Sequence, residues 1–374
     1  MKRGWRMAAS LGLGGLLATT LLAGATVCLT SGCSTIGYYA QSATGHLNLV
    51  QAARPVPQWL ADPATPPRLK ARLELSQRIR DFAVAELGEP DNASYRRYAD
   101  LKRGAAVWNV VAAPELSLEL KTWCFAVVGC VAYRGYYDRA EAEAFAADLL
   151  AREKLDVHVY PVPAYSTLGK LPAADWLADP LLNTFIDYPE GELARLIFHE
   201  LAHQVAFAPG DTLFNESFAS TVEKIGAQRW LVERAAPAAR AEYEVAEARR
   251  ADFRALTSRY RDELARLYAS AQGDDAKRTE KAAILARLRA DYAAMKATRW
   301  NGYAGYDGWF DQANNAEFAV LASYTALVPA FEKLFEREGE DFPRFYAEVR
   351  RIAAMPSRER HAALGATAAS SAHP

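Results

Sequence analysis

The chain has 374 residues, of which 51% are hydrophobic and 24% are charged. Its 44 basic and 45 acidic residues give a formal net charge of −1 at pH 7, and this balance gives no indication of nucleic-acid binding. The length and apolar content are sufficient for one large hydrophobic core or two modest ones.

The amino terminus has the features of a secretory signal. A basic start at positions 1–6 precedes an uncharged stretch of apolar and small residues, which ends at Gly32-Cys33 in the manner of a bacterial lipobox. We therefore expect residues 1–32 to be a lipoprotein signal peptide and Cys33 to carry a lipid anchor. The alternative is an uncleaved signal anchor. Ser34 follows the cysteine, and resemblance to Gram-negative lipoproteins then favours an envelope protein of the outer membrane that faces the periplasm.

Residues 33–100 are expected to form a helical segment packed on the core, with a proline-rich interruption at 54–67. Strands are then predicted by four short runs rich in β-branched and aromatic residues, at 106–111, 125–128, 131–136 and 157–160. A helical pattern at 140–153 separates the last two strands, which predicts a βαβ crossover within a small mixed sheet.

Cys124 and Cys130 lie among these predicted strands. An oxidising envelope compartment would allow them to form a disulfide, and two free buried thiols are the alternative.

The run FHELAHQ at 198–204 carries the strongest chemical signal. Asp187 and Glu190 fit a capping box at the start of its helix, and Pro209-Gly210 ends it. Two histidines four residues apart project from one face of a helix, so His199 and His203 could bind one tetrahedral Zn²⁺. Glu200 is rotated by about 100° around the axis, which would let its carboxylate act as a general base on water beside the metal.

A second helical pattern follows after a short loop, and Asp211 or Thr212 could cap it. Glu216, near its start, lies off the apolar stripe and would face back toward the first helix. Two helices joined by a short loop pack nearly antiparallel, which allows a His199/His203/Glu216 zinc site with an open fourth position. The alternative is a helical hairpin whose histidines are only structural.

Further residues are assigned by their position relative to this site. Glu223, two turns after Glu216, and Asn215 are candidates for orienting the metal ligands. The remaining histidines are not expected to be ligands: two stand alone and two lie near the chain end, namely His46, His158, His361 and His373.

The last third of the chain is predicted to be mainly helical. Residues 234–298 form a helical hairpin with a break near 272–275, whose charges mark a solvated face or, alternatively, a partner surface. The aromatic and glycine-rich residues 300–310 fit a wall of a substrate cleft. We therefore expect a catalytic unit at 101–335, and a C-terminal helix and mobile tail at 336–374, the tail beginning after Pro356.

HELAHQ followed by FNESFASTVE resembles the gluzincin zinc peptidases, in particular segments of the large alanyl-type aminopeptidases. From residue 33 to about 334 the chain also resembles the bacterial family of putative aminopeptidase lipoproteins. The motifs that carry this resemblance are GYY at 37–39, SYRRY at 94–98, KTWC at 121–124, GCV at 129–131, YSTLG at 165–169, the two metal segments, NN at 314–315 and VP at 328–329. The resemblance implies metal ligands at His199, His203 and Glu216 and a general base at Glu200. Two departures from the alanyl-type enzymes are the shorter spacing between His203 and Glu216 and the absence of a GAMEN-like segment from the sequence.

The resemblance also implies a fold and further site residues. The fold class is α+β and predominantly helical, with a zincin-like catalytic core, a small mixed sheet, an active-site helix and a long helical hairpin. Gluzincins add a Tyr or His that stabilises the oxyanion, and Tyr324 is the first candidate, ahead of Tyr303 and Tyr306; helix packing is its alternative role. In zincins an edge strand binds extended substrate, so Tyr165, Ser166 and Thr167, or the strand before them, are candidates, with a plain turn as the alternative.

The expected function is that of a lipid-anchored zinc peptidase, with aminopeptidase activity favoured by the family resemblance. The expected partners are a peptide or protein substrate and the membrane that holds the anchor. An envelope endopeptidase, a non-catalytic zinc-stabilised envelope binding protein and a zinc amidase acting on cell-wall peptides are the alternatives. The sequence makes no prediction of the oligomeric state.

Overall fold

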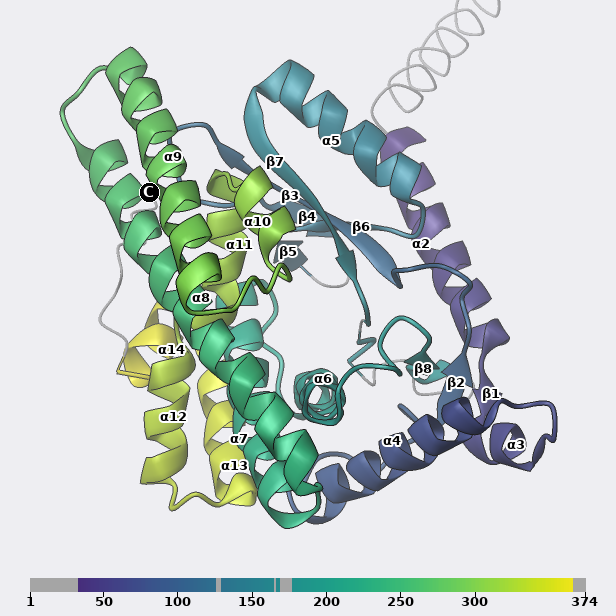
Figure 1. The fold of residues 1–374 in the computed structure, drawn as a ribbon. Helices are drawn as coiled ribbons and strands as arrows, with labels where there is room; N and C mark the ends of the chain where they lie inside the picture. The colour runs from purple at the N-terminus through teal and green to yellow at the C-terminus, as the bar shows by residue number, and fades with distance from the viewer. Residues whose placement is uncertain (1–32, 126–128, 165, 169–176, 366–374) are drawn as a thin grey trace, which may run out of the picture. The chain divides into compact units, whose positions relative to one another are not determined.

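The computed structural model describes residues 33–125, 129–164, 166–168 and 177–365. The chain divides into two units, Met1–Asn48 and Leu49–Pro374. The first unit contributes most of helix α2 (Cys33–Ala52), and the second contains the other elements (Figure 1). The predicted signal peptide at 1–32 and the candidate residue Tyr165 lie outside the described residues.

The second unit begins with short elements set by proline. Strand β1 (Arg54–Pro55) leads into α3 (Val56–Ala61), and α4 (Pro67–Ala85) begins with a proline, whose fixed φ suits a first helical turn. Strand β2 (Arg97–Ala99) pairs antiparallel with β1 and parallel with β8 (Leu181–Leu182). This small sheet joins the N-terminal elements to the chain that enters the histidine helix.

A second sheet has the order β6-β3-β7. Its strands are β3 (Val107–Pro114), β6 (Arg134–Tyr136) and β7 (Leu155–Val162), and α5 (Arg139–Glu153) connects β6 to β7. The crossover links two parallel strands, as predicted, but β3 lies between them and pairs antiparallel with both. Among the described strands β7 pairs only with β3, so its other edge is free for pairing.

A pair of short strands comes between β3 and β6 in the sequence. Strands β4 (Trp123–Phe125) and β5 (Gly129–Val131) pair antiparallel, with Cys124 opposite Cys130. The two cysteines form a disulfide.

Two packed helices, α6 (Glu190–Val205) and α7 (Thr212–Glu233), carry the histidine motif and the segment that follows it. The predicted cap of α7 is confirmed, because the Asp211 carboxylate accepts a hydrogen bond from Phe214 N at 3.0 Å. The predicted capping box of α6 is wrong, because Pro189 occupies the N-cap position and makes no side-chain cap. Gly226 allows α7 to pack closely: a Cβ there would lie 2.9 Å from the Phe198 ring of α6 and 2.6 Å from Leu87.

The predicted helical hairpin consists of α8 (Pro237–Ala269) and α9 (Asp274–Thr298). It has a hydrophobic cluster of its own, in which Leu264 and Leu288 are fully buried together with Phe310 of α10 (Asp307–Gln312). Stacking of the Tyr292 and Phe310 rings, whose centroids lie 3.8 Å apart, holds α10 against α9.

The chain continues with α11 (Asn315–Thr325), α12 (Val328–Arg337), α13 (Phe342–Ala353) and α14 (Ser357–Ala363). By length and composition alone residues 315–337 could cross a membrane, but they form two helices here, and Phe318, Phe331 and Leu334 are buried in the hydrophobic clusters. Part of the tail that is predicted to be mobile after Pro356 forms α14, while residues 366–374 lie outside the described part of the chain. The described elements confirm a predominantly helical α+β fold.

Candidate metal centre

Three potential ligand atoms converge where α6 faces the start of α7. His199 Nε2 lies 3.2 Å from His203 Nε2 and 3.3 Å from Glu216 Oε2, and His203 Nε2 lies 3.7 Å from the same oxygen. Ligands held at 2.0–2.1 Å from a tetrahedral ion are separated by about 3.3 Å. Two imidazole nitrogens and one carboxylate oxygen also form a donor set that suits Zn²⁺, so the three side chains fit the ion by geometry and by chemistry.

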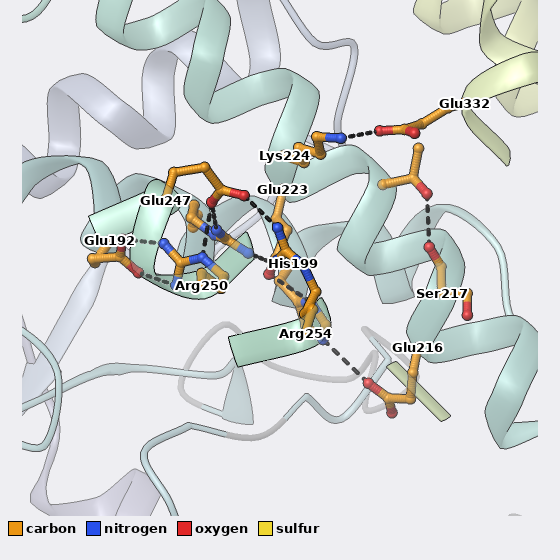
Figure 2. A network of polar contacts seen from close by, with 12 residues as sticks. Glu192, His199, Glu216, Ser217, Glu223, Lys224, Glu247, Arg250, Arg254 and Glu332 are labelled. Carbon is orange, nitrogen blue, oxygen red and sulfur yellow. Dashed lines mark hydrogen bonds and ion pairs between the residues drawn. The ribbon is translucent and has the colours of Figure 1, made fainter. Parts of the chain in front are cut away.

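Glu223 supports the first of the two histidines. Its Oε2 atom contacts His199 Nδ1 (Figure 2) at 2.9 Å. Its other oxygen pairs with Arg195. Burial raises the pKa of Glu223, but the charges of Arg195 and His199 outweigh burial and lower it to about 2. The carboxylate can therefore accept the Nδ1 proton of His199, which directs the Nε2 lone pair toward the ligand cluster.

Without a metal, the electrostatics of the cluster leave His203 and Glu216 in the forms that bind a cation, whereas His199 would have to release a proton. Burial lowers the pKa of His203 to about 4, so its imidazole is neutral at pH 7. Burial raises the pKa of Glu216, but its interactions with His203 and His199, including a hydrogen bond to His199, outweigh burial and lower it. For His199, burial lowers the pKa, but hydrogen bonds to Glu216 and Glu223 raise it well above its ordinary value. His203 Nδ1 is buried and has no hydrogen-bond partner among the described residues, so only His199 has a supporting carboxylate here.

Glu200 follows His199 on α6 and lines the cavity beside it. Burial raises its pKa to about 7, and the charge of Glu216 adds to this effect while His199 opposes it. A carboxyl group with a pKa near neutrality can both accept and release a proton at pH 7.

Two tyrosines lie beside the ligand cluster. The Tyr324 ring of α11 stacks on His199 with centroids 6.2 Å apart, and Tyr160 of β7 is close enough to Tyr324 to affect its pKa. Burial raises the pKa of Tyr160 to about 12 and that of Tyr324 well above its ordinary value. Both phenols therefore remain protonated and can donate hydrogen bonds. Tyr160 is a site residue that the sequence did not single out, and its hydroxyl also accepts from Asn109 Nδ2 at 3.4 Å.

A cavity of about 680 Å³, which we call the main cavity, is lined by His199, Glu200, Tyr160 and Tyr324 of this site, whereas His203 and Glu216 lie behind its lining. Its lining includes five acidic residues, Glu192, Glu200, Glu223, Glu247 and Glu332. It also includes four basic residues, each of which is paired with an acid: Arg195, Lys224, Arg250 and Arg254. Arg250 of α8 binds Glu192 at 2.6 Å and Glu247 at 2.8 Å, which ties α8 to α6 (Figure 2). Long-range pairs of this kind have no local sequence signal.

The predicted substrate-binding segment and the strand before it differ in whether they line the main cavity. Residues 160–164 line the main cavity, whereas Ser166 and Thr167 do not. Thr167 N donates to both carboxylate oxygens of Asp179 at 3.1 Å, and the Ser166 hydroxyl accepts from Leu168 N. These two residues are thus engaged with Leu168 and Asp179, and residues 160–162 at the end of β7 are the part of the strand that lines the cavity.

Asn215 lies next to Glu216, but its amide is engaged elsewhere. Its Oδ1 accepts from Ala208 N at 2.8 Å and its Nδ2 donates to Ala208 O at 2.9 Å. Asn215 therefore braces the loop between α6 and α7, and it makes no hydrogen bond to either histidine among the described contacts.

His361 belongs to a buried cluster that the sequence did not indicate. Asp211, the cap of α7, accepts from His361 Nε2 at 2.9 Å and from Arg360 at 2.5 Å. Burial raises the pKa of Asp211, but the hydrogen bond from His361 and the neighbouring charges outweigh it and lower the pKa. The C-terminal helix α14 thus holds the end of the helix that carries Glu216.

Fold and site together define a class: a predominantly helical α+β protein with an HExxH helix, whose two histidines converge with a glutamate from the next helix. The chain belongs to the family described as "Putative aminopeptidase", whose model matches residues 37–364. The comparisons with curated proteins and with solved structures found no match.

Proposed function

We propose that the protein is a zinc-dependent aminopeptidase of the cell envelope. The observation that carries this proposal is the convergence of His199, His203 and Glu216, with ligand atoms 3.2 to 3.7 Å apart, beside Glu200 in a large cavity. Family membership supports peptidase activity on amino termini.

The metal site would be formed by His199, His203 and Glu216, with Glu223 orienting His199. A zinc ion held there supplies a Lewis acid for a carbonyl oxygen and makes nearby water more acidic. A purely structural site has no need of a general base beside it, so the presence of Glu200 favours catalysis over a role in holding two helices together.

Proton transfer is assigned to Glu200. Its carboxylate takes a proton from water as the scissile carbonyl is attacked, and delivers that proton to the leaving amine. The pKa of about 7 describes Glu200 without a metal, and a bound cation lowers it, which increases the fraction in the base form at neutral pH.

Tyr324 is assigned the role of oxyanion donor. Tyr324, Tyr160 and Glu200 line the same cavity, in which a substrate carbonyl would lie, and Glu216 is close enough to affect the pKa of Tyr324. Donation of a hydrogen bond to the carbonyl oxygen, as negative charge develops on it, lowers the barrier. Tyr160, whose hydroxyl accepts from Asn109, lies beside Tyr324 in the cavity. The end of β7 at 160–162 and the two residues after it would bind the extended substrate backbone.

We further propose that Cys33 is lipidated after removal of residues 1–32, so that the mature protein is anchored to the outer membrane and faces the periplasm. The disulfide between Cys124 and Cys130 supports an oxidising compartment.

The test combines metal analysis with hydrolysis of peptide libraries by the full-length protein in detergent. One equivalent of zinc in both wild type and Glu200→Gln, with cleavage of free-amino peptides by wild type alone, is the expected result. Cleavage of amino-blocked peptides would make the protein an endopeptidase, zinc without any cleavage would favour a structural site, and absence of zinc would refute the metal assignment.

A further inference from the structure

A second, smaller cavity lies against the main cavity. It has a volume of about 270 Å³ and is formed by α8 and α11. Three residues line both cavities, namely Arg254, Leu321 and Thr325. We call this second cavity the side chamber.

The charges of the side chamber differ from those of the main cavity. Its lining contains two cations, Arg254 and Arg261, and no carboxylate. The other lining residues are small, hydroxylated or apolar: Thr257, Ser258, Phe318, Leu321, Ala322, Thr325 and Ala326. Because the two arginines are seven residues apart on α8, they project from one face of the helix about two turns apart. The side chamber therefore has a cationic wall.

The two arginines have capacity for a further anion. Arg254 donates to Glu247 through one Nη atom, at 2.6 Å, and this pair faces the main cavity. Arg261 Nε is buried and has no hydrogen-bond partner in the described part of the chain. The carboxylate paired with Arg261 is that of its own neighbour Asp262, 3.8 Å away and largely exposed. The Arg261 side chain as a whole is 39% exposed, so the acceptor of its N–H groups comes from outside the chain, and an anion can take the place of water there.

Two of the three hydroxyl groups in the side chamber are engaged within their own helices. Thr257 donates to Phe253 O at 2.8 Å, and Thr325 donates to Leu321 O at 3.1 Å. The groups that can recognise an anion are therefore the two guanidinium groups and the hydroxyl of Ser258, which lies at an exposed position.

We propose that the side chamber binds a carboxylate of the peptide substrate, through Arg261 and Arg254. A guanidinium group matches a carboxylate with two parallel hydrogen bonds, and this geometry discriminates against a neutral amide. The carboxylate comes from an acidic side chain or from the C-terminus of a short peptide. The proposal rests on the proposed peptidase function, because it takes the peptide in the main cavity as the source of the anion.

The experiment measures kcat/KM of the full-length protein at low ionic strength with two sets of free-amino peptides. One set contains pairs that differ only by Glu or Gln at each position in turn, and the other compares a C-terminal acid with its amide. Wild type is expected to prefer the carboxylate at one position by about tenfold, mainly through KM. The set that shows the preference identifies the source of the carboxylate.

Arg261→Gln is expected to abolish this preference and to leave hydrolysis of the neutral peptides unchanged. Arg261→Lys keeps the charge but lacks the planar fork, so it should keep only part of the preference. The matched control is Arg266→Gln, which removes the same charge from an exposed position on α8 and should keep the full preference. Thermal unfolding curves of all three variants establish that they are folded.

Failure of this proposal can be distinguished from failure of the proposed function. Cleavage of neutral and acidic peptides at equal rates, or equal loss of the preference in Arg261→Gln and Arg266→Gln, would overturn the proposal that the side chamber binds a carboxylate. Either result would leave the proposed peptidase function intact. If no peptide is cleaved, calorimetric binding of the acidic peptides to wild type and Arg261→Gln decides. Binding that depends on Arg261 would support carboxylate binding in the side chamber even without catalysis. Binding that does not depend on Arg261, or no binding, would refute carboxylate binding there.

Discussion

Replacement of Glu223 by glutamine tests whether this carboxylate on α7 orients the metal ligand His199 on α6. Glu223→Gln keeps the size of the side chain but removes the charge that faces His199 Nδ1 at 2.9 Å. A glutamine oxygen that accepts from His199 must turn its NH₂ group toward Arg195, which is itself a donor. The variant therefore loses either the bond to His199 or the bond to Arg195.

The expected loss follows from this contact. Removing a carboxylate that orients a ligating histidine weakens metal affinity by about 10- to 100-fold, or roughly 1.4 to 2.7 kcal/mol. Arg195 is 12% exposed and retains Glu247 at 3.1 Å, so its charge is not left unpaired. We therefore expect a fall in unfolding free energy of only about 1 to 3 kcal/mol, less than for a fully broken buried pair.

The assay is competition for zinc against a chelator of known affinity, at a fixed pH and with folded protein. Glu332→Gln is the matched control, because it removes an acidic group from the same cavity whose partner is Lys224. The control should keep wild-type zinc affinity. Equal zinc affinity of wild type and a folded Glu223→Gln would refute the role of Glu223.

Four further predictions concern the hydroxyl donor, a buried acid, a helix contact and the C-terminal cluster. Tyr324→Phe should lower kcat by about 10²- to 10³-fold with unchanged zinc content, whereas unchanged peptide hydrolysis would leave Tyr324 a packing residue. Glu317 has a fully buried side chain, and burial raises its pKa from 4.5 to about 8. The folded state therefore holds one more proton than the unfolded state between these pH values, so stability falls as pH rises through this window, by up to about 5 kcal/mol. Glu317→Gln should flatten the dependence of urea unfolding on pH from 5 to 8, and an unchanged slope would contradict the assignment. Gly226→Ala should destabilise the metal-free protein by about 1 to 2 kcal/mol in urea unfolding, whereas Gly308→Ala, where a Cβ meets nothing within 4 Å, should not. Arg360→Met breaks the ion pair with Asp211, in which the two side chains are 7% and 6% exposed. It should lower the free energy of unfolding by about 2 to 4 kcal/mol, and not by more, because Asp211 retains His361. The control Arg351→Met removes an ion pair whose arginine is largely exposed, and it should have little effect on the same unfolding curves.

The parts of the site that were predictable depend on local periodicity. His199 and His203 share a face because they are four residues apart on one helix, and Asp211 caps α7 because it comes just before a helical pattern. The crossover through α5 follows from a helical pattern between two strands. Each of these inferences needs only residues within one element or its neighbours.

The remaining parts depend on which elements pack together, and neither composition nor spacing determines this. Tyr160 lies next to Tyr324 because β7 packs against α11, 164 residues later in the numbering. Arg250 reaches Glu192 because α8 crosses α6. The alanine-rich tail predicted mobility, yet two of its residues, Arg360 and His361, find a partner at Asp211, about 150 residues earlier.

The position of Glu216 depends on contacts that fix α7 at several points. Arg360 and His361 hold the Asp211 cap, Asn215 holds the loop before the helix, and Gly226 sets the close approach of α7 to α6. Because Glu216 lies one turn after the cap, a shift of the helix start moves its carboxylate relative to both histidines. Arg360→Met should therefore weaken zinc affinity as well as stability, although Arg360 is not a ligand. If the variant lost stability and kept wild-type zinc affinity, the ligand geometry would depend on the close contact at Gly226 and not on the cap.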